Sequence, residues 1–355
     1  MKILYGVVGE GMGHATRSRV ILNHLVQRHE LQIVVSGRAH AYLKQHFPDV
    51  IEIEGLRMTY ENNQVDRSAT FWDFLKRLPT LVSTNFDAFR QLSERFQPEA
   101  VVSDFESFAY MFGKHHGVPV ISIDNMQVLN RCELDIRIGP EHEQDFQIAK
   151  GIVKSKLPGC YHYLITSFFF PPVRKERTSL YPPILRRRIL QAERSLGEHL
   201  LVYQTSTSNT ALLEILKATG VPCRVYGFGR EERLGNVHLR PFSEDGFIED
   251  LASCRGVLAT GGFSLMGEAI YLGKPLLAVP LRKQFEQILN ALYLEKLHYG
   301  AYAEELSAPA VEAFCERLEE YRQALASYAQ DGNTLILGAL DRLLGEVASP
   351  PRHEE

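Results

Sequence analysis

Short apolar runs alternate with longer stretches of helical periodicity along most of this chain, and the alternation occurs in two successive series. Such alternation is typical of β–α–β units, in which helices join parallel strands. A chain of 355 residues is long enough for two such units, because single hydrophobic cores rarely grow beyond about 250 residues. The sequence therefore predicts an α/β protein with two Rossmann-like parallel-sheet domains that face each other across a cleft.

The two series define the expected strands and domain limits. The strands are expected near 3–8, 31–36, 50–54, 100–103, 118–123 and 163–166 in the first series, and near 200–204, 223–226, 237–239, 256–259 and 275–279 in the second. Prolines and charges between residues 171 and 183 interrupt regular structure. We therefore expect a first domain over 1–175, a linker over 176–195, a second domain over 196–347 and a frayed tail over 348–355.

The composition describes an ordinary soluble protein. Hydrophobic residues make up 45%, charged residues 23%, and the formal net charge of -4 gives no reason to expect nucleic acid as a partner. The five cysteines form no C-x-x-C pair and indicate reduced thiols. The N-terminus runs straight into a strand-like segment without the features of a signal peptide, and no apolar run approaches the ~18 residues that span a bilayer. We expect a cytoplasmic protein.

A glycine-rich loop, Gly9-Glu10-Gly11-Met12-Gly13-His14, follows the first expected strand and precedes a helix expected over 15–28. Glycines allow tight turns close to a ligand, and helix starts present free N–H groups to anions. The spacing differs from the G-x-G-x-x-G of dinucleotide enzymes, and the second strand ends in Ser36-Gly37-Arg38 rather than an acid. NAD is disfavoured, Arg38 leaves NADP open, and the absence of G-K-[S/T] excludes a P-loop.

Three residues are candidates for acid–base chemistry. His14 lies at the junction of loop and helix, where a neutral imidazole is able to take a proton from a hydroxyl, and Glu10 is an alternative in the same loop. Asp104 ends a buried-type strand and is placed to orient His14. The competing interpretations are structural: His14 caps its helix, Glu10 is solvated, and Asp104 is the N-cap of the following helix.

The segment from Gly256 to Gly300 carries the strongest signal. A strand meets the small-residue turn Gly261-Gly262 and then a helix with Ser264 in its first turn, which suits a diphosphate. Glu268 follows four residues later, and its carboxylate is able to accept hydrogen bonds from ribose hydroxyls.

This block resembles the donor-binding region of GT-B glycosyltransferases, in particular the family that transfers N-acetylglucosamine from its UDP donor onto lipid I in peptidoglycan synthesis. The resemblance implies that the turn binds diphosphate, Glu268 binds ribose, and Gln287 and Asn290 lie near the donor sugar. The loop with Gly11, Gly13 and His14 resembles that family's first glycine motif. All the motifs together are most similar to a less characterised bacterial and archaeal branch of these transferases.

The sequence departs from that family at Thr205-Ser206-Thr207, which replace a glycine-rich turn, so we expect hydroxyl and backbone contacts to phosphate there. Phe242 is expected near the nucleotide base. The sequence has no D-x-D motif, so we expect neither metal nor cofactor, and the charge of the leaving group is assigned to helix N-termini.

The resulting hypothesis is an inverting transfer of a sugar, with N-acetylglucosamine as one candidate, from a UDP donor to a hydroxyl acceptor that is lipid- or glycan-linked. The segment 71–78 combines apolar and basic residues and suggests peripheral contact with the inner face of the membrane, although packing of an amphipathic helix on the protein's own core is the preferred explanation. Two alternatives stay open: a UDP-sugar 2-epimerase of the same fold and a non-catalytic regulator that binds nucleotide sugars.

Overall fold

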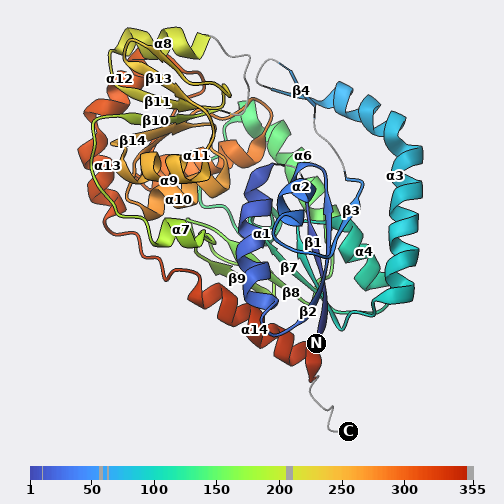
Figure 1. The fold of residues 1–355 in the computed structure, drawn as a ribbon. Helices are drawn as coiled ribbons and strands as arrows, with labels where there is room; N and C mark the ends of the chain where they lie inside the picture. The colour runs from blue at the N-terminus through green and yellow to red at the C-terminus, as the bar shows by residue number, and fades with distance from the viewer. Residues whose placement is uncertain (10, 56–58, 62–63, 205–210, 350–355) are drawn as a thin grey trace.

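The structure, a computed structural model, describes residues 1–9, 11–55, 59–61, 64–204 and 211–349, with side chains described except at 59–61, 64–75 and 77–81. Two α/β domains lie side by side in Figure 1, the N-terminal one mainly blue to green and the C-terminal one yellow to orange. Each contains one large sheet with helices packed against it. The predicted architecture of two parallel-sheet domains is confirmed.

The N-terminal sheet has seven strands in the order β3-β2-β1-β6-β7-β8-β9, and all neighbours pair in parallel. The strands are β1 (Lys2–Val7), β2 (Glu30–Ser36), β3 (Val50–Ile53), β6 (Ala100–Asp104), β7 (Val120–Asp124), β8 (His162–Thr166) and β9 (Thr178–Tyr181). The direction of strand addition reverses between β1 and β6. Ligands of open α/β sheets bind at such a switch point, beyond the carboxyl ends of the strands.

Helices and one hairpin complete this domain. They are α1 (Met12–Leu25), α2 (Arg38–Lys44), the antiparallel pair β4 (Thr59–Glu61) and β5 (Gln64–Asp66), α3 (Arg67–Arg95), α4 (Ser107–His115), α5 (Val128–Arg131) and α6 (Pro140–Lys156). The long helix α3 forms the outer edge of the domain in Figure 1.

The C-terminal sheet has the order β12-β13-β11-β10-β14-β15-β16, parallel except for the pair β12 and β13. Its strands are β10 (Leu200–Tyr203), β11 (Cys223–Tyr226), β12 (Glu232–Leu234), β13 (Val237–Arg240), β14 (Gly256–Ala259), β15 (Leu276–Ala278) and β16 (Gly300–Tyr302). Its helices are α8 (Ala211–Thr219), α9 (Glu244–Ser253), α10 (Phe263–Tyr271), α11 (Phe285–Lys296), α12 (Ala308–Glu316) and α13 (Leu318–Leu325). Here the switch point lies between β10 and β14.

The connections between the domains differ from the predicted boundaries. The segment predicted as a linker, 176–195, contributes β9 to the N-terminal sheet before the short helix α7 (Arg187–Leu190). The last helix, α14 (Thr334–Ala348), was expected in the second domain, but it packs on the first because its leucines share a core with β1 and α1. The chain passes into the second domain after β9 and returns to the first before α14, and Asn333 joins these two passages. Its side chain accepts from the N–H of Leu185 and donates to the carbonyl of the same residue.

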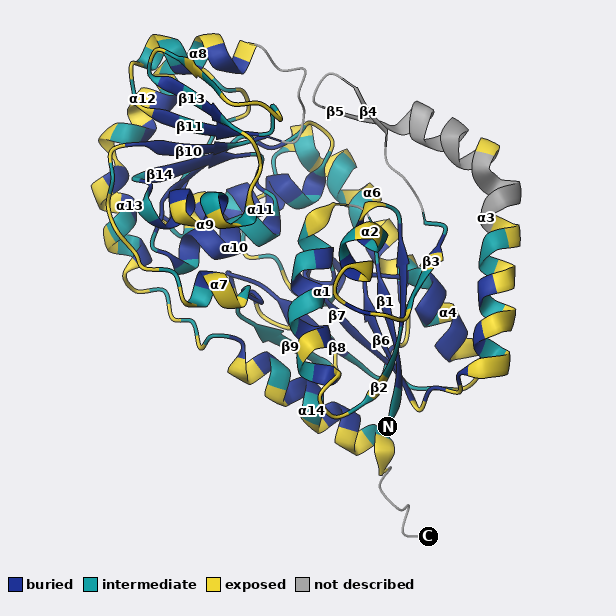
Figure 2. Ribbon diagram, in the orientation of Figure 1, coloured by how far each residue is buried: buried dark blue, intermediate teal, exposed yellow. Residues whose placement is uncertain are grey.

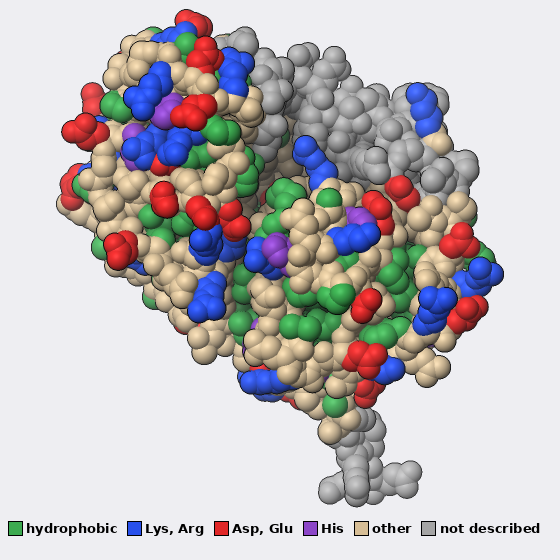
Figure 3. Space-filling view, viewed as in Figure 1, with side chains coloured by type: hydrophobic (Ala, Val, Ile, Leu, Met, Phe, Trp, Pro, Cys, Tyr) green, Lys and Arg blue, Asp and Glu red, His purple; other side chains and the backbone are tan. Residues whose placement is uncertain are grey.

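Burial follows from this layering. Strands of both sheets are mostly buried and the outer helix faces exposed, as the dark blue and yellow of Figure 2 show. The near-continuous apolar run of β1 is explained by helices on both faces of its sheet. On the face shown in Figure 3, basic and acidic side chains are interspersed over the described parts of both domains.

Candidate functional site

The glycine loop leads directly into α1. This helix begins at Met12, three residues earlier than predicted, so Gly13 and His14 lie in its first turn. Gly11 precedes the helix with φ of 82°, a backbone conformation that favours glycine. No side chain of the described residues caps this end, which leaves N–H groups of the first turn available to a ligand.

His14 and Asp104 are brought together by the sheet. β1 and β6 are neighbours, with Val7 opposite Asp104, so the loop after β1 lies beside the end of β6. His14 Nδ1 lies 2.8 Å from Asp104 Oδ1, and the His14 side chain is 15% exposed whereas Asp104 is fully buried. The interpretation of Asp104 as an N-cap is wrong, because Glu106 caps α4 by accepting from the N–H groups of Phe108 and Ala109.

Sequence reasoning missed two further partners of Asp104. Arg17 donates to it from Nε (3.0 Å) and Nη2 (2.5 Å), and Ser18 donates through its hydroxyl (2.8 Å). Burial alone would raise the pKa of Asp104, but the charges of Arg17 and His14 outweigh it and hold that pKa well below its usual range. The missed signal was helical spacing, because Arg17 and Ser18 follow His14 by three and four positions and share its face of α1.

Arg17 also determines what the His14 ring is able to do. Its Nη2 lies 2.6 Å from His14 Nδ1, the same nitrogen that faces Asp104. A guanidinium only donates, so a proton on Nδ1 must point to Asp104, and Nε2 is then free to accept a proton. If Arg17 donated to Nδ1 instead, Nε2 would carry the proton and the ring would not be a base at that atom.

The first turns of α1 and α10 meet at the junction of the domains. A Cβ atom added to Gly13 would lie 2.6 Å from the Ser264 hydroxyl, so any larger residue at this position requires that hydroxyl to move. The helix α10 begins at Phe263 after Gly262, again without a side-chain cap, and Gly261 has φ of 86°. Two helix N-termini, each with a partial positive charge, therefore lie next to each other.

Gln287 and Asn290, predicted near the donor sugar, are both buried on α11. Asn290 donates to the carbonyl of Gly261 (3.0 Å), and the Gln287 side chain accepts from the N–H of Leu281 (2.9 Å). In this structure they fix the loops that follow β14 and β15.

Glu268 has a partner that the sequence did not indicate. Arg186 donates to its two oxygens at 2.6 and 2.7 Å and to Glu244 at 3.0 Å. Burial alone would lower the pKa of Arg186, but Glu268 and Glu244 outweigh it and raise that pKa. Glu268 is 6% exposed, and the residue that holds its carboxylate, Arg186, directly precedes α7 in the segment between the two domains.

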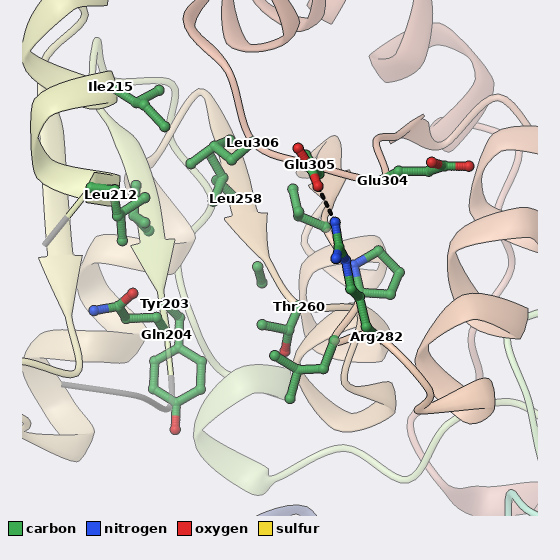
Figure 4. Close-up of a pocket in the computed structure, with 16 residues that line it drawn as sticks. Tyr203, Gln204, Leu212, Ile215, Leu258, Thr260, Arg282, Glu304, Glu305 and Leu306 are labelled. Carbon is green, nitrogen blue, oxygen red and sulfur yellow. Dashed lines mark hydrogen bonds and ion pairs between the residues drawn. The ribbon is translucent and has the colours of Figure 1, made fainter. Parts of the chain in front are cut away.

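A pocket of about 310 Å³ lies at the switch point of the C-terminal sheet. Figure 4 shows Tyr203 and Gln204 on one side and the ion pair of Arg282 with Glu305 on the other, with Thr260 between them. The amide nitrogen of Gln204 is buried without a partner in the described chain. The pocket adjoins two predicted donor segments, since Gln204 precedes Thr205 and Thr260 precedes Gly261.

Some predicted site residues fall outside the described part of the chain, and one lies at the surface. Glu10, Thr205, Ser206 and Thr207 fall outside the described residues. Phe242 is 65% exposed and its ring contacts that of Phe247, with 5.9 Å between the centroids. Within the described residues, no three acids, histidines or cysteines are grouped as a metal site would require.

The predicted membrane-contact segment, 71–78, lies in α3, and of its side chains only Lys76 is described, as exposed. In the described part of the chain, no helix combines the length and apolar character that crossing a bilayer requires.

Comparison with known sequences classifies the chain. Residues 1–319 match the family described as Glycosyl transferase family 1. The chain belongs to this family. An uncharacterised glycosyltransferase of Methanosarcina acetivorans is 24% identical over 98% of this chain and 97% of its own length. One from Methanosarcina mazei is 24% identical over 98% of this chain and 100% of its own.

Solved structures give the same fold for this family 1 glycosyltransferase. The calicheamicin glycosyltransferase CalG4 superposes with a TM-score of 0.68 at 16% identity, covering 99% of both chains. UGT2 of Phytolacca americana, complexed with UDP-2-fluoro-glucose and pterostilbene, gives 0.66 at 16% identity and covers 98% of this chain and 99% of its own. VinC, in complex with dTDP, gives 0.63 at 15% identity, with 98% and 100% covered. The predicted GT-B fold and glycosyltransferase class are confirmed; the closer relation to the peptidoglycan family stays a prediction.

Proposed function

We propose that the chain transfers a sugar from a nucleoside diphosphate donor to a hydroxyl acceptor, with His14 as general base. The observation that carries this proposal is the buried ion network of Asp104 and Arg17 beneath His14, at the edge where the first turn of α1 meets that of α10. A partly exposed histidine held by a buried acid is the arrangement that proton abstraction needs.

The proposed reaction is a single displacement. His14 Nε2 takes the proton of the acceptor hydroxyl as its oxygen forms a bond to the anomeric carbon. The bond from that carbon to the β-phosphate oxygen breaks at the same time, and the nucleoside diphosphate leaves with the electron pair. Attack opposite to the leaving group inverts the anomeric centre. Asp104 stabilises the imidazolium that forms.

The diphosphate is assigned to the uncapped N-termini of α1 and α10, including Gly11, Gly13, Gly262 and the Ser264 hydroxyl. Fixed N–H dipoles stabilise the developing charge without reorganisation, and no step of the proposal needs a metal ion. Thr205, Ser206 and Thr207, which follow β10, are proposed as further phosphate contacts.

The nucleoside is assigned to the C-terminal domain. The exposed ring of Phe242 offers a stacking surface for the base, and Glu268 has lone pairs left for ribose hydroxyls beside the two that Arg186 occupies. Gln287 and Asn290 are proposed to shape the sugar subsite through the loops that they hold. UDP is the preferred nucleotide, supported by the UDP-sugar in the Phytolacca structure, with dTDP as the alternative supported by VinC.

The finer assignments belong to the same proposal. N-acetylglucosamine as the sugar, a lipid- or glycan-linked acceptor and a cytoplasmic location with contact at the inner membrane face stay predictions from the motifs. Glu10 stays an alternative base.

Thermal-shift titration with UDP, dTDP, GDP, NAD and NADP tests the donor class, because a ligand that binds only the folded state raises its stability. We expect stabilisation by UDP or dTDP that weakens in Ser264→Ala. Stabilisation by NADP alone would replace this proposal with a reductase. Replacing Glu268 is a poorer test, because it leaves Arg186 without its main partner.

A further inference from the structure

The hydrogen bonds around Asp104 continue beyond Arg17 into the second domain. Arg17 Nη1 donates to Asn125 Oδ1 at 2.9 Å, and Asn125 Nδ2 donates to Glu286 Oε1 at 2.7 Å. Asn125 follows β7 directly and is buried, whereas Glu286 lies in the first turn of α11. The chain of contacts therefore runs from His14 through Arg17 and Asn125 to the helix that carries Gln287 and Asn290.

The orientation of the Asn125 amide decides what Arg17 does. Arg17 only donates, so it needs the oxygen of the amide and is repelled by the nitrogen. Glu286, as a carboxylate, only accepts, so it fixes the nitrogen on its own side and leaves the oxygen for Arg17. A second domain docked as in this structure thus selects the amide orientation that holds the guanidinium.

The helix α11 is itself fixed on the N-terminal domain. Tyr293 donates to Asp135 at 2.8 Å and stacks on Phe169 with 3.7 Å between ring centroids. Lys296 pairs with the same aspartate at 2.5 Å. Glu286 therefore approaches Asn125 from a rigid support.

We propose that Asn125, with its amide oriented by Glu286, is a positioning residue that holds Arg17 on Asp104 and so keeps the proton of His14 on Nδ1. This inference rests on the proposed function of His14 and adds the condition under which that residue is a base. With Arg17 held at Nε and Nη1, the plane of its guanidinium is fixed so that the Nη2 proton on the side of Nε points to Asp104. Without Asn125, the guanidinium is held by Asp104 alone and is able to tilt until Nη2 donates to His14 Nδ1, and the ring takes the tautomer that is not a base at Nε2.

Two variants separate this role from a merely structural one. Asn125→Ala removes the acceptor for Arg17. Asn125→Asp combined with Glu286→Gln keeps an acceptor for Arg17 and reverses the other bond, because the new amide donates to the new carboxylate. Asn130→Ala is the control, a matched substitution at a buried asparagine whose side-chain oxygen accepts from Lys175 instead.

The measurements are kcat, donor KM and the ring ¹⁵N shifts of His14 in protein labelled at histidine. The His14 signals are assigned among the 13 histidines by their loss in His14→Gln. We expect Asn125→Ala to lower kcat about ten- to hundred-fold, with donor KM changed less than about threefold, and to move the ring shifts toward the Nε2–H tautomer. The double variant, which keeps both hydrogen bonds with the donor and acceptor exchanged in one of them, and the Asn130→Ala control are expected within about threefold of wild type, with wild-type ring shifts.

Wild-type kcat and ring shifts in Asn125→Ala would overturn the inference. So would equal losses in Asn125→Ala and in the double variant, since the reversed pair would then have no positioning effect. The ring shifts are read without acceptor or turnover, so the tautomer is decided even if no transfer is found. A His14→Ala variant with full transfer activity would reject the base role and leave the tautomer result standing.

Discussion

At the switch point of the N-terminal sheet, between β1 and β6, polar side chains are buried and bonded to one another, whereas the matching point of the C-terminal sheet, between β10 and β14, opens into a pocket. Asp104 has three side-chain partners there, while the buried amide nitrogen of Gln204 has none in the described chain. The polar groups at the N-terminal switch point are thus bonded within the protein, whereas the pocket at the C-terminal one leaves a polar group for a ligand. The comparison teaches that one architecture can bury a bonded polar network at one switch point and leave a pocket at the other, which the proposal assigns to the base and to the donor.

The largest expected effect comes from removing the proposed base. His14→Ala should lower transfer about 10²- to 10⁴-fold, the usual contribution of a general base, while nucleotide binding changes little, because the proposed phosphate contacts at α1 are backbone N–H groups that the substitution keeps. Rates and nucleotide Kd values are compared with those of His24→Ala, a histidine further along α1 that pairs with Asp341. Equal rates in the two variants would end the assignment.

Breaking the ion network should cost stability. Arg17→Met leaves a buried carboxylate without its cation, and we expect the free energy of unfolding to fall by about 3–5 kcal/mol at neutral pH. Urea unfolding measures this, with Arg19→Met on the same helix as the control, expected to lose less than about 1 kcal/mol.

The loss of stability in Arg17→Met should depend on pH, because it arises from the charge of Asp104. In the native protein the folded pKa of Asp104 is lowered, so its contribution to stability is present above the unfolded pKa and is lost as the pH falls through the folded value. In Arg17→Met, burial instead raises the folded pKa, and stability is lost as the pH rises through it. The deficit of the variant should therefore grow between about pH 4 and about pH 7. A deficit that is constant over this range would show that the charge of Asp104 is not its cause.

The contact between the first turns of α1 and α10 tests whether both domains contribute to the proposed site. Gly13→Ala forces a Cβ against the Ser264 hydroxyl, and we expect transfer to fall about tenfold through displacement of the two helix ends. Adding Ser264→Ala removes the hydroxyl that the new Cβ contacts, so it should restore part of the thermal midpoint that Gly13→Ala lowers in the free protein. Gly151→Ala, where an added Cβ meets nothing within 4 Å, serves as the control. Loss without any rescue would place the effect of Gly13 elsewhere.

The smallest effect is expected on nucleotide affinity when Phe242, the proposed stacking partner of the base, is replaced. Phe242→Ala should weaken UDP binding about two- to tenfold, the worth of one aromatic stacking contact, without changing the thermal midpoint of the free protein. Leu196→Ala, at a similarly exposed apolar residue, should change neither quantity. Isothermal titration measures the Kd values and a thermal scan measures the midpoints, and identical Kd values for the two variants would remove Phe242 from the site.

Much of this architecture follows from sequence because alternation of strands and helices is a local signal. The paired approach of His14 and Asp104 was also predictable, since both follow strands whose carboxyl ends share one edge. Asn125 and Arg186 were not found, because their partners lie far away in the sequence: 58 positions separate Arg186 from Glu244, and 161 separate Asn125 from Glu286. The spacing of Arg17 from His14 was visible in the sequence, but its bond to Asp104, 87 positions away, was not. The return of α14 to the first domain was missed for the same reason: an amphipathic helix shows which face is buried but not which core receives it.

Product analysis of the purified protein with UDP- and dTDP-sugars and a panel of hydroxyl acceptors tests the central claim most directly. Mass spectrometry identifies the products, and proton NMR reads the anomeric configuration. The account predicts a glycoside of inverted configuration with an equal amount of nucleoside diphosphate, both lost in His14→Ala. An epimerised nucleotide sugar without a glycoside, or tight nucleotide binding without turnover of any donor, would contradict it.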